Sequence, residues 1–402
     1  MFTFPAAQGK LVNIRALQRI RKLTYYAAVL FLACSQYWTV ERVAGNELLS
    51  EAVDVYRSRI DKGKLPNVIL HVIHDGEVVL SEALGWRDKA AQAEMQTDTL
   101  LRMASNTKAV VATAVLILQQ RRLLSIDDRV SQYLPAFDND AHREITIKQM
   151  LSHTSGWRFK SLFVFPLLEP NDDFPRRPNL QSEVDRLAGI VPSKEPGVSY
   201  SYNNAAYNTI GALIEKVSGE SLEQFLVSNI YEPLRMVDSS NRPPTGRIEE
   251  MSVVYGVPSK NDSEQWSVRF KREARMRVPF VRASGGMVST ADDYAKFCQM
   301  FLGYGKYQGV RILSRRSVQQ ATFPVTKEIY TAAERLERTS YYGLGWKVHD
   351  DESYSHTGSE GTFVWVDPPR KIIGMALSQS AGFDNPREEF RRAVTKAIDS
   401  SK

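Results

Sequence analysis

The protein has 402 residues, of which 43% are hydrophobic and 24% charged, a balance typical of folded globular proteins. Five of its six net positive charges lie within residues 1–33, which carry no acidic side chain, so the rest of the chain has a net charge of +1. A body so close to neutrality gives no reason to expect a nucleic-acid partner.

The N-terminal segment predicts export. Basic residues precede an apolar run over residues 23–33, which is too short for a stable membrane span and suits a signal sequence. Cys34 follows directly and resembles a bacterial lipoprotein processing site, although Phe31 and Leu32 fit that pattern poorly. Lipidation at Cys34, ordinary cleavage and an uncleaved membrane anchor therefore stay open, as does an amphipathic helix on a cytosolic protein. We expect residues 1–35 to be the leader of a periplasmic or membrane-anchored protein.

Only one further cysteine, Cys298, is present, and it falls within a helical pattern. If Cys34 is lipidated or removed, Cys298 has no intramolecular partner. We therefore expect no structural disulfide.

The first part of the domain predicts a helix, a hairpin and a buried helix. Apolar residues recur at helical spacing over residues 40–60. Residues 68–73 and 77–84 alternate in polarity on either side of an Asp-Gly pair, which favours a tight hairpin turn. The apolar run over residues 109–118 is followed by basic residues, a pattern typical of a buried helix with its C-terminal end in solvent.

The middle of the chain predicts a helical lobe. Helical patterns cover residues 145–151, 181–187 and 205–217, the last ended by Gly219. A capping box at residues 221–224 begins another helix. Residues 159–179 contain four prolines and predict a long surface loop, whereas residues 246–275 show no clear period and stay unassigned.

Strand patterns return after residue 278. Short runs over residues 343–348, 362–366 and 372–377 predict strands, while Thr290 and Pro386 begin helices. Strands at both ends of the chain imply an α+β fold in which one sheet, assembled from both ends, carries an inserted helical lobe. The domain over residues 36–402 then divides into an α/β lobe at about 45–135 and 278–402 and a helical lobe at about 136–277.

Ser105 and Lys108 lie three residues apart at the start of the buried helix, so their side chains share a face. A serine is a poor nucleophile unless a neighbour takes its proton. A lysine whose charge is disfavoured by apolar surroundings could be that neighbour. Because a Ser–Lys pair at this spacing often arises by chance, the rest of the chain has to decide.

Two other clusters carry suitable chemistry. Tyr202 and Asn204, two apart in an extended loop, point the same way, and a tyrosine near an ammonium loses its proton more easily, so Tyr202 could be a general base for Ser105. His356 can donate a hydrogen bond to a substrate carbonyl or carboxylate, and Gly358 lets a ligand approach the backbone. Considered alone, Tyr202 could equally be an aromatic residue that packs in the core, and His356 could be a histidine with a purely structural role.

Other patterns do not support a site. The residues of Ser152–Gly156 are too close in sequence to meet as a Ser/His dyad, and we interpret them as a rigid, hydrogen-bonded turn. His71 and His74 point to opposite faces of a strand, which argues against a metal pair. The sequence has no zinc motif, phosphate loop or nucleophile elbow.

In chain order, Ser105-x-x-Lys108, Tyr202-x-Asn204 and His356-Thr357-Gly358 resemble the motifs of the serine β-lactamase and penicillin-binding protein superfamily, in its class C-like branch of esterases and D-aminopeptidases. The resemblance covers roughly residues 45–400. It extends to the stretches Thr97–Arg102, Leu151–Trp157, Pro196–Asn204, Ser284–Thr290 and Tyr342–Trp346.

The resemblance implies a site in the cleft between an antiparallel sheet flanked by helices and an all-helical lobe. Ser105 would be the acylating nucleophile, and Lys108 and Tyr202 would share the proton transfers. Asn204 would orient Lys108 and the substrate amide, and the backbone N–H groups of Ser105 and Ser359 would form the oxyanion hole. No cofactor and no metal is implied.

His356 stands where many members of the superfamily have lysine. A histidine with an unperturbed pKa near 6.5 is mostly neutral at pH 7 and holds a carboxylate less firmly. We therefore expect a small ester or peptide-like substrate, with β-lactam or D-Ala-D-Ala hydrolysis as the alternative. A non-catalytic binding or scaffold protein is the alternative of another class, disfavoured because each catalytic position holds a competent residue.

Overall fold

The computed structural model describes residues 49–157, 179–242, 246–257, 266–271 and 280–401. Cys34, the rest of the leader and nearly all of the proline-rich stretch lie outside these residues. The chain divides into two units, residues 1–50 and 51–402, and the second contains the elements described below.

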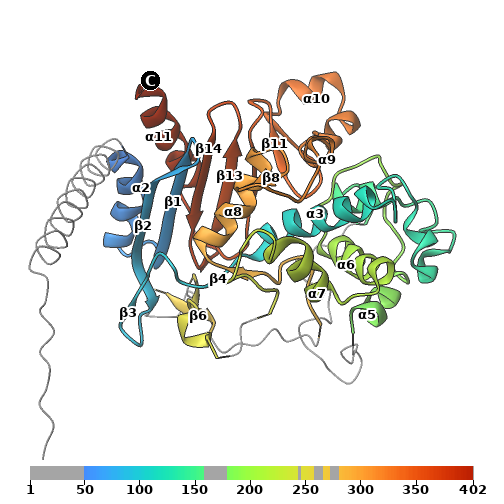
Figure 1. Ribbon diagram of the computed structural model, residues 1–402, viewed down its shortest axis with the longest axis horizontal. Helices are drawn as coiled ribbons and strands as arrows, with labels where there is room; N and C mark the ends of the chain where they lie inside the picture. Colours follow the sequence, from blue (N-terminus) through green and yellow to red (C-terminus); the bar gives the residue numbers. More distant parts are fainter. Residues whose placement is uncertain (1–48, 158–178, 243–245, 258–265, 272–279, 402) are drawn as a thin grey trace, which may run out of the picture. The chain divides into compact units, whose positions relative to one another are not determined.

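One antiparallel sheet of eight strands forms the centre of the second unit, in the order β10-β11-β12-β13-β14-β1-β2-β3 (Figure 1). β1 (Asn67–His74) and β2 (Glu77–Asp88) form the expected hairpin, whose two turn residues both have positive φ. β1 also pairs with β14 (Ile372–Leu377), with Ile69 opposite Leu377. This pairing confirms the sheet built from both ends of the chain, and with it the α+β fold class.

The prediction of one continuous strand over residues 343–348 is wrong. Two short strands, β10 (Ser340–Tyr342) and β11 (Lys347–His349), lie on either side of a turn. Gly345 in this turn has φ of +79°, and a Cβ on it would lie 2.8 Å from the carbonyl oxygen of Lys108. The chain therefore turns back at the point where it meets the first turn of α3 (Thr107–Gln120).

Helices cover both faces of the sheet. On one face, Phe390 of α11 (Arg387–Ser400) packs edge-on against Trp365 of β13 (Thr362–Asp367), with ring centroids 5.6 Å apart. On the other, Phe301 of α8 (Ala291–Leu302) contacts Tyr354 of β12 (Tyr354–Thr357). α2 (Ser50–Asp61) lies beside α11 (Figure 1), and the ring of Tyr56 contacts that of Phe390.

The helical part surrounds α3, which is buried from Thr107 to Leu118. It contains α4 (Ile147–Leu151), α5 (Leu180–Leu187), α6 (Asn204–Ser218) and α7 (Leu222–Leu226). The predicted ends are confirmed, because Gly219 takes a left-handed conformation after α6 and Ser221 forms a capping box with Gln224. Both features satisfy backbone groups that a helix end leaves free.

The stretch left unassigned from sequence contributes β5 (Val254–Gly256) and β6 (Ser267–Phe270), which join β15 (Ser380–Ala381) in a small second sheet. Such short strands give too few residues for a recognisable period. The remaining elements are β3 (Ala93–Glu94), β4 (Leu101–Arg102), η1 (Ala104–Asn106), η2 (Val130–Gln132), η3 (Pro135–Phe137), η4 (Val227–Tyr231), η5 (Ile248–Glu250), β7 (Val288–Ser289), β8 (Lys306–Tyr307), β9 (Val310–Arg311), α9 (Arg315–Ala321), η6 (Val325–Ile329) and α10 (Ala332–Leu336).

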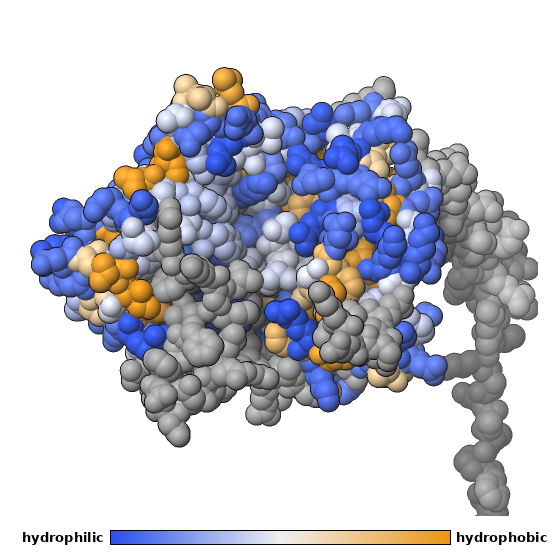
Figure 2. All heavy atoms as spheres, turned by 180° about the vertical axis from the view of Figure 1, so that it is seen from behind, coloured by the Kyte–Doolittle hydropathy of each residue, from blue (hydrophilic) through white to orange (hydrophobic). Residues whose placement is uncertain are grey.

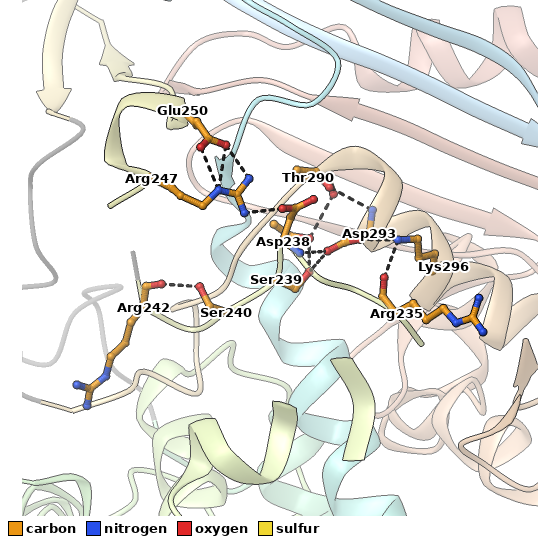
Figure 3. A network of polar contacts seen from close by, with 11 residues as sticks. Arg235, Asp238, Ser239, Ser240, Arg242, Arg247, Glu250, Thr290, Asp293 and Lys296 are labelled. Carbon is orange, nitrogen blue, oxygen red and sulfur yellow. Dashed lines mark hydrogen bonds and ion pairs between the residues drawn. The ribbon is translucent and has the colours of Figure 1, made fainter. Parts of the chain in front are cut away.

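A polar network ties the start of α8 to the chain after α7 (Figure 3). Thr290 caps α8 as predicted, accepting a hydrogen bond from the Asp293 N–H at 3.3 Å. The buried Asp293 carboxylate accepts from the Asp238 N–H and from Lys296, each at 2.7 Å. Arg247 then pairs with Asp238 at 2.5 Å. These contacts hold the polar segment around Asp238 against the start of α8, at the edge of the core.

The surface opposite to the view of Figure 1 is mostly hydrophilic, with several separate apolar areas (Figure 2). Within the described segments, no helix combines the length and the apolar character needed to cross a bilayer. Cys298 is fully buried in α8, and burial raises the pKa of its thiol well above the ordinary value.

Candidate active site

Ser105 lies in the tight turn between β4 and α3, and 9% of its surface is exposed. The preceding Ala104 has φ of +47°, a conformation that costs an alanine free energy and often accompanies functional sites. Neighbouring side chains hold this turn in place. Thr107 Oγ1 donates to the Ala104 carbonyl at 2.6 Å, and Asn106 Nδ2 donates to Thr362 Oγ1 on β13 at 2.8 Å. The nucleophile candidate is therefore fixed to both α3 and the sheet.

Lys108 is completely buried, and its amine lies between three oxygens. Its Nζ is 3.1 Å from Ser105 Oγ, 2.8 Å from Asn204 Oδ1 and 2.6 Å from the carbonyl oxygen of Ser284. Burial, and then the positive charge of Arg282, lower the pKa of Lys108 well below its ordinary value of 10.5. The structure thus brings together Ser105, Lys108 and Asn204, three of the residues expected from sequence.

The three partners define what a neutral Lys108 can do. The Asn204 Oδ1 and Ser284 carbonyl oxygens can only accept hydrogen bonds. A neutral amine has two N–H donors and one lone pair, so donating to both oxygens leaves the lone pair for Ser105. The Ser105 hydroxyl can then donate its proton to Lys108, which is the arrangement that a general base requires.

Tyr202 reaches the same point from the other side of the site. The Lys108 amine lies 4.8 Å from the centre of its ring, and a hydrogen bond with the Ser105 side chain acts on its hydroxyl. Burial nevertheless raises the pKa of Tyr202 above its ordinary value of 10.0. The expectation that this phenol loses its proton more easily is therefore wrong, because desolvation of the phenolate outweighs the favourable contacts. Tyr202 is a neutral phenol that can donate.

His356 is buried at the end of β12, and both of its ring nitrogens are used. Nδ1 lies 2.9 Å from the Thr357 carbonyl, which can only accept, so Nδ1 carries the proton. Nε2, 2.9 Å from the Tyr342 hydroxyl, then accepts. Burial, followed by the charge of Lys108, lowers the pKa of His356 to about 3. The histidine is neutral, as expected, but the donor role expected for it is wrong, because its only N–H is already engaged.

Gly358 and Ser359 follow β12 beside the nucleophile turn. A Cβ on Gly358 would lie 2.1 Å from Thr362 Oγ1 and 3.0 Å from the Cβ of Ala104, so a larger residue would push the turn away. The Gly358 N–H donates to the Thr362 carbonyl at 2.7 Å. The amides of Ser105 and Ser359 make no backbone hydrogen bond to another described residue.

A cavity of about 370 Å³ opens beside Tyr202 and His356. Tyrosine rings form part of its wall, beside polar and charged groups that include Arg338, Lys347 and Glu388. The tyrosines that line it are Tyr200, Tyr202, Tyr330, Tyr341 and Tyr342. In the described segments, no group of three or more histidines, cysteines or acidic residues is placed to hold a metal ion.

Sequence reasoning missed three contributors. The Ser284 carbonyl is a backbone atom, so no residue type reveals it, although Ser284–Thr290 was one of the flanking stretches. Arg282 acts on Lys108 through its charge, and Tyr342 orients His356 through a hydrogen bond. One indication of that contact was present in the sequence, because Tyr342 begins the flanking stretch Tyr342–Trp346.

Comparison with models of known families gives a match over most of the chain. A family model described as Beta-lactamase matches residues 50–397.

The chain belongs to the β-lactamase family.

Among the relatives of this β-lactamase family member is protein Rv1367c of Mycobacterium tuberculosis (strain ATCC 25618 / H37Rv), 27% identical over 80% of this chain and 88% of the relative. N-acetylmuramyl-L-alanine amidase of Bacillus subtilis (strain 168) is 24% identical over 78% of this chain and 76% of the amidase. EstCE1, a solved structure described as a hydrolase with promiscuous acyltransferase activity, matches the fold with a TM-score of 0.72 at 20% identity, over 89% of this chain and 99% of that one. The family match supports a catalytic role, that of a serine hydrolase.

Proposed function

We propose that the protein hydrolyses a small ester or peptide-like amide through an acyl-enzyme on Ser105. The observation that carries the proposal is the position of the Lys108 amine, whose two acceptor-only partners direct its lone pair at Ser105. A buried lysine with a lowered pKa is neutral more often than a free one, and only the neutral form can take a proton.

The reaction follows from these positions. Ser105 Oγ attacks the substrate carbonyl while its proton passes to Lys108, and the N–H groups of Ser105 and Ser359 stabilise the negative oxygen that forms. The Tyr202 hydroxyl donates a proton to the departing alkoxide or amine and regains one from Lys108. Water then attacks the acyl group by the same route in reverse, which releases the acid and restores Ser105.

The surroundings of the site favour a substrate part without a carboxylate next to His356. That imidazole is neutral and has no free donor, so it cannot hold an anion as a lysine would. The tyrosine-lined cavity offers apolar ring surface to an acyl or leaving group. Hydrolysis of β-lactams or of D-Ala-D-Ala peptides is the second candidate, supported by the family and by a relative named as a putative D-alanyl-D-alanine carboxypeptidase.

The experiment that tests this function is covalent labelling. A serine-reactive phosphonate should add one phosphonyl group to the protein, and peptide mass spectrometry should place it on Ser105. A labelled penicillin, run in parallel, should show whether the β-lactam route is open. Unlabelled Ser105 after both reagents, in folded protein, would favour a scaffold role instead.

We propose further that the leader exports the protein and that Cys34 is its lipidation site. The basic and apolar layout of residues 1–33 supports export, and the cell-wall amidase among the relatives fits it. Metabolic labelling with a radioactive fatty acid should label the natural chain and not Cys34→Ala. Label on both, or on neither while the protein is exported, would reject lipidation at Cys34.

A further inference from the structure

The turn over residues 152–156 lies against the segment that carries Tyr202. Its own bonds make it rigid, since the Thr154 N–H donates to the Gln149 carbonyl at 2.8 Å and Ser152 Oγ lies 2.9 Å from Thr154 Oγ1. Thr154 also binds the facing segment, accepting from the Gly197 N–H at 2.7 Å. The turn is therefore hydrogen-bonded, as expected, and it is connected directly to the active site.

His153 is the member of this turn that contacts the catalytic tyrosine. Its imidazole is 1% exposed, and its centroid lies 4.3 Å from that of the Tyr202 ring. The rings of Tyr342 at 4.7 Å and Tyr207 at 5.2 Å enclose it further. The face of the Tyr202 phenol that meets His153 therefore has no room to move.

His153 also binds the backbone on both sides of Tyr202. Its carbonyl oxygen accepts from the Ser201 N–H at 2.9 Å, and its Nδ1 accepts from the Asn203 N–H at 3.1 Å. Asn203 is in turn the N-cap of α6, whose first residue is Asn204. His153 thus holds, through its backbone carbonyl and its imidazole, the segment that supplies two of the site's polar groups, Tyr202 and Asn204.

The conformation and charge of His153 suit this task. Its φ of +62° is unusual for a residue other than glycine, and strain of this kind persists only where the surroundings hold it. Burial lowers the pKa of His153 well below 6.5, so the imidazole is neutral. Because Nδ1 accepts from the Asn203 N–H, the single ring proton lies on Nε2.

We propose that His153 is a positioning residue that holds the hydroxyl of Tyr202 at Ser105. The proposal rests on the function proposed above, in which Tyr202 protonates the leaving group. It goes beyond that function because His153 packs against the ring of Tyr202 and acts on the reaction through the placement of that residue. This role predicts that substitution of His153 lowers the reaction rate most for substrates whose leaving group needs a proton.

Two substitutions separate the contacts of His153. His153→Phe keeps a ring but removes the acceptor for Asn203, whereas His153→Asn keeps an acceptor at the place of Nδ1, tolerates positive φ and loses the ring. With an alkyl ester, whose alkoxide needs a proton, His153→Phe should lower kcat/KM, which reports acylation, about 10- to 100-fold, as a misplaced group does. With the p-nitrophenyl ester of the same acid, which releases a stable anion, kcat/KM should fall less than about threefold. His153→Asn should show the same difference between the esters, at a smaller size.

A double-mutant comparison distinguishes positioning from a general structural effect. In the Tyr202→Phe background, which has no hydroxyl to position, His153→Phe should have no further effect on the alkyl ester. The matched control is His142→Phe, which alters another buried histidine of the helical part, whose Nε2 lies 2.9 Å from the Ile190 carbonyl. It should lower the melting temperature and leave the ratio of the two esters unchanged.

The outcomes that overturn the proposal are distinct. An equal loss for both esters, or the same loss with and without the Tyr202 hydroxyl, would make His153 a structural residue only and leave the proposed function intact. If Tyr202→Phe itself were as active as the natural enzyme on the alkyl ester, the proposed role of Tyr202 would fail, and the role of His153 with it. If His153→Phe does not fold, His153→Asn is judged by the same two comparisons.

Discussion

Ser105→Ala should lower kcat for a p-nitrophenyl acyl ester by about 10⁴- to 10⁶-fold, the range seen when a serine hydrolase loses its nucleophile. Removing one oxygen leaves Lys108, Asn204 and the core of α3 in place, so circular dichroism and the melting temperature should change little. The same substitution should abolish labelling by the phosphonate. Loss of activity without loss of fold would assign the chemistry to this hydroxyl.

The matched control for this experiment is Ser58→Ala, which removes an exposed hydroxyl on α2. It should retain the full rate, and it shows whether preparation alone lowers activity. Turnover by Ser105→Ala at the natural rate would falsify the acyl-enzyme on this residue. A contaminating esterase could also give activity at the natural rate. The phosphonate distinguishes the two cases, because inhibition together with the site at which the phosphonate is attached shows which protein is active.

Lys108→Met should lower kcat/KM about 10²- to 10⁴-fold, the usual contribution of a general base. Methionine has a similar length, and it fits a buried helical position without carrying a charge. The phosphonate should still reach Ser105 but react far more slowly, because the hydroxyl no longer has a proton acceptor. Labelling at the natural rate by Lys108→Met would assign the base to another group.

The pH dependence of kcat/KM provides a second measurement on Lys108. Since only the neutral amine accepts a proton, activity should rise with pH through the pKa of Lys108, which lies well below its ordinary 10.5. Arg282→Gln removes a positive charge that lowers this pKa, so the pKa should rise and the acid limb should move to higher pH. Arg121→Gln, at the far end of α3, removes a like charge and should not move the limb. An unchanged limb in Arg282→Gln, or equal shifts in both variants, would contradict the assignment.

Much of this fold could be predicted from residue patterns, because those patterns reflect local physics. An Asp-Gly pair between alternating runs identifies the first hairpin, and a serine followed three residues later by glutamine identifies the start of α7. The site was predicted in the same way, since Ser105, Lys108, Asn204 and Tyr202 are residues whose chemistry is visible in their type. Their convergence depended on the resemblance to a known family, as no spacing brings residue 105 to residue 204.

What could not be predicted depends on burial and on backbone atoms. The proton stays on Tyr202 because the surrounding protein desolvates the phenol, a property that no short motif contains. The two nitrogens of His356 are used by Tyr342 and by a backbone carbonyl, so its lack of a free donor appears only in three dimensions. The turn at Gly345 was interpreted as a strand because its contact with α3 cannot be read from neighbouring residues.

The pairing of β1 with β14 has a consequence for biogenesis. The two strands of this pair are far apart in sequence, since β1 ends at His74 and β14 begins 298 positions later, at Ile372. Until β14 has been synthesised, the edge of β1 opposite β2 has no partner. Contacts that span so much of a chain close slowly, so the polypeptide stays unfolded for longer during and after translation. The sheet that holds the nucleophile turn through Thr362 on β13 is therefore completed only when β14 pairs with both β13 and β1.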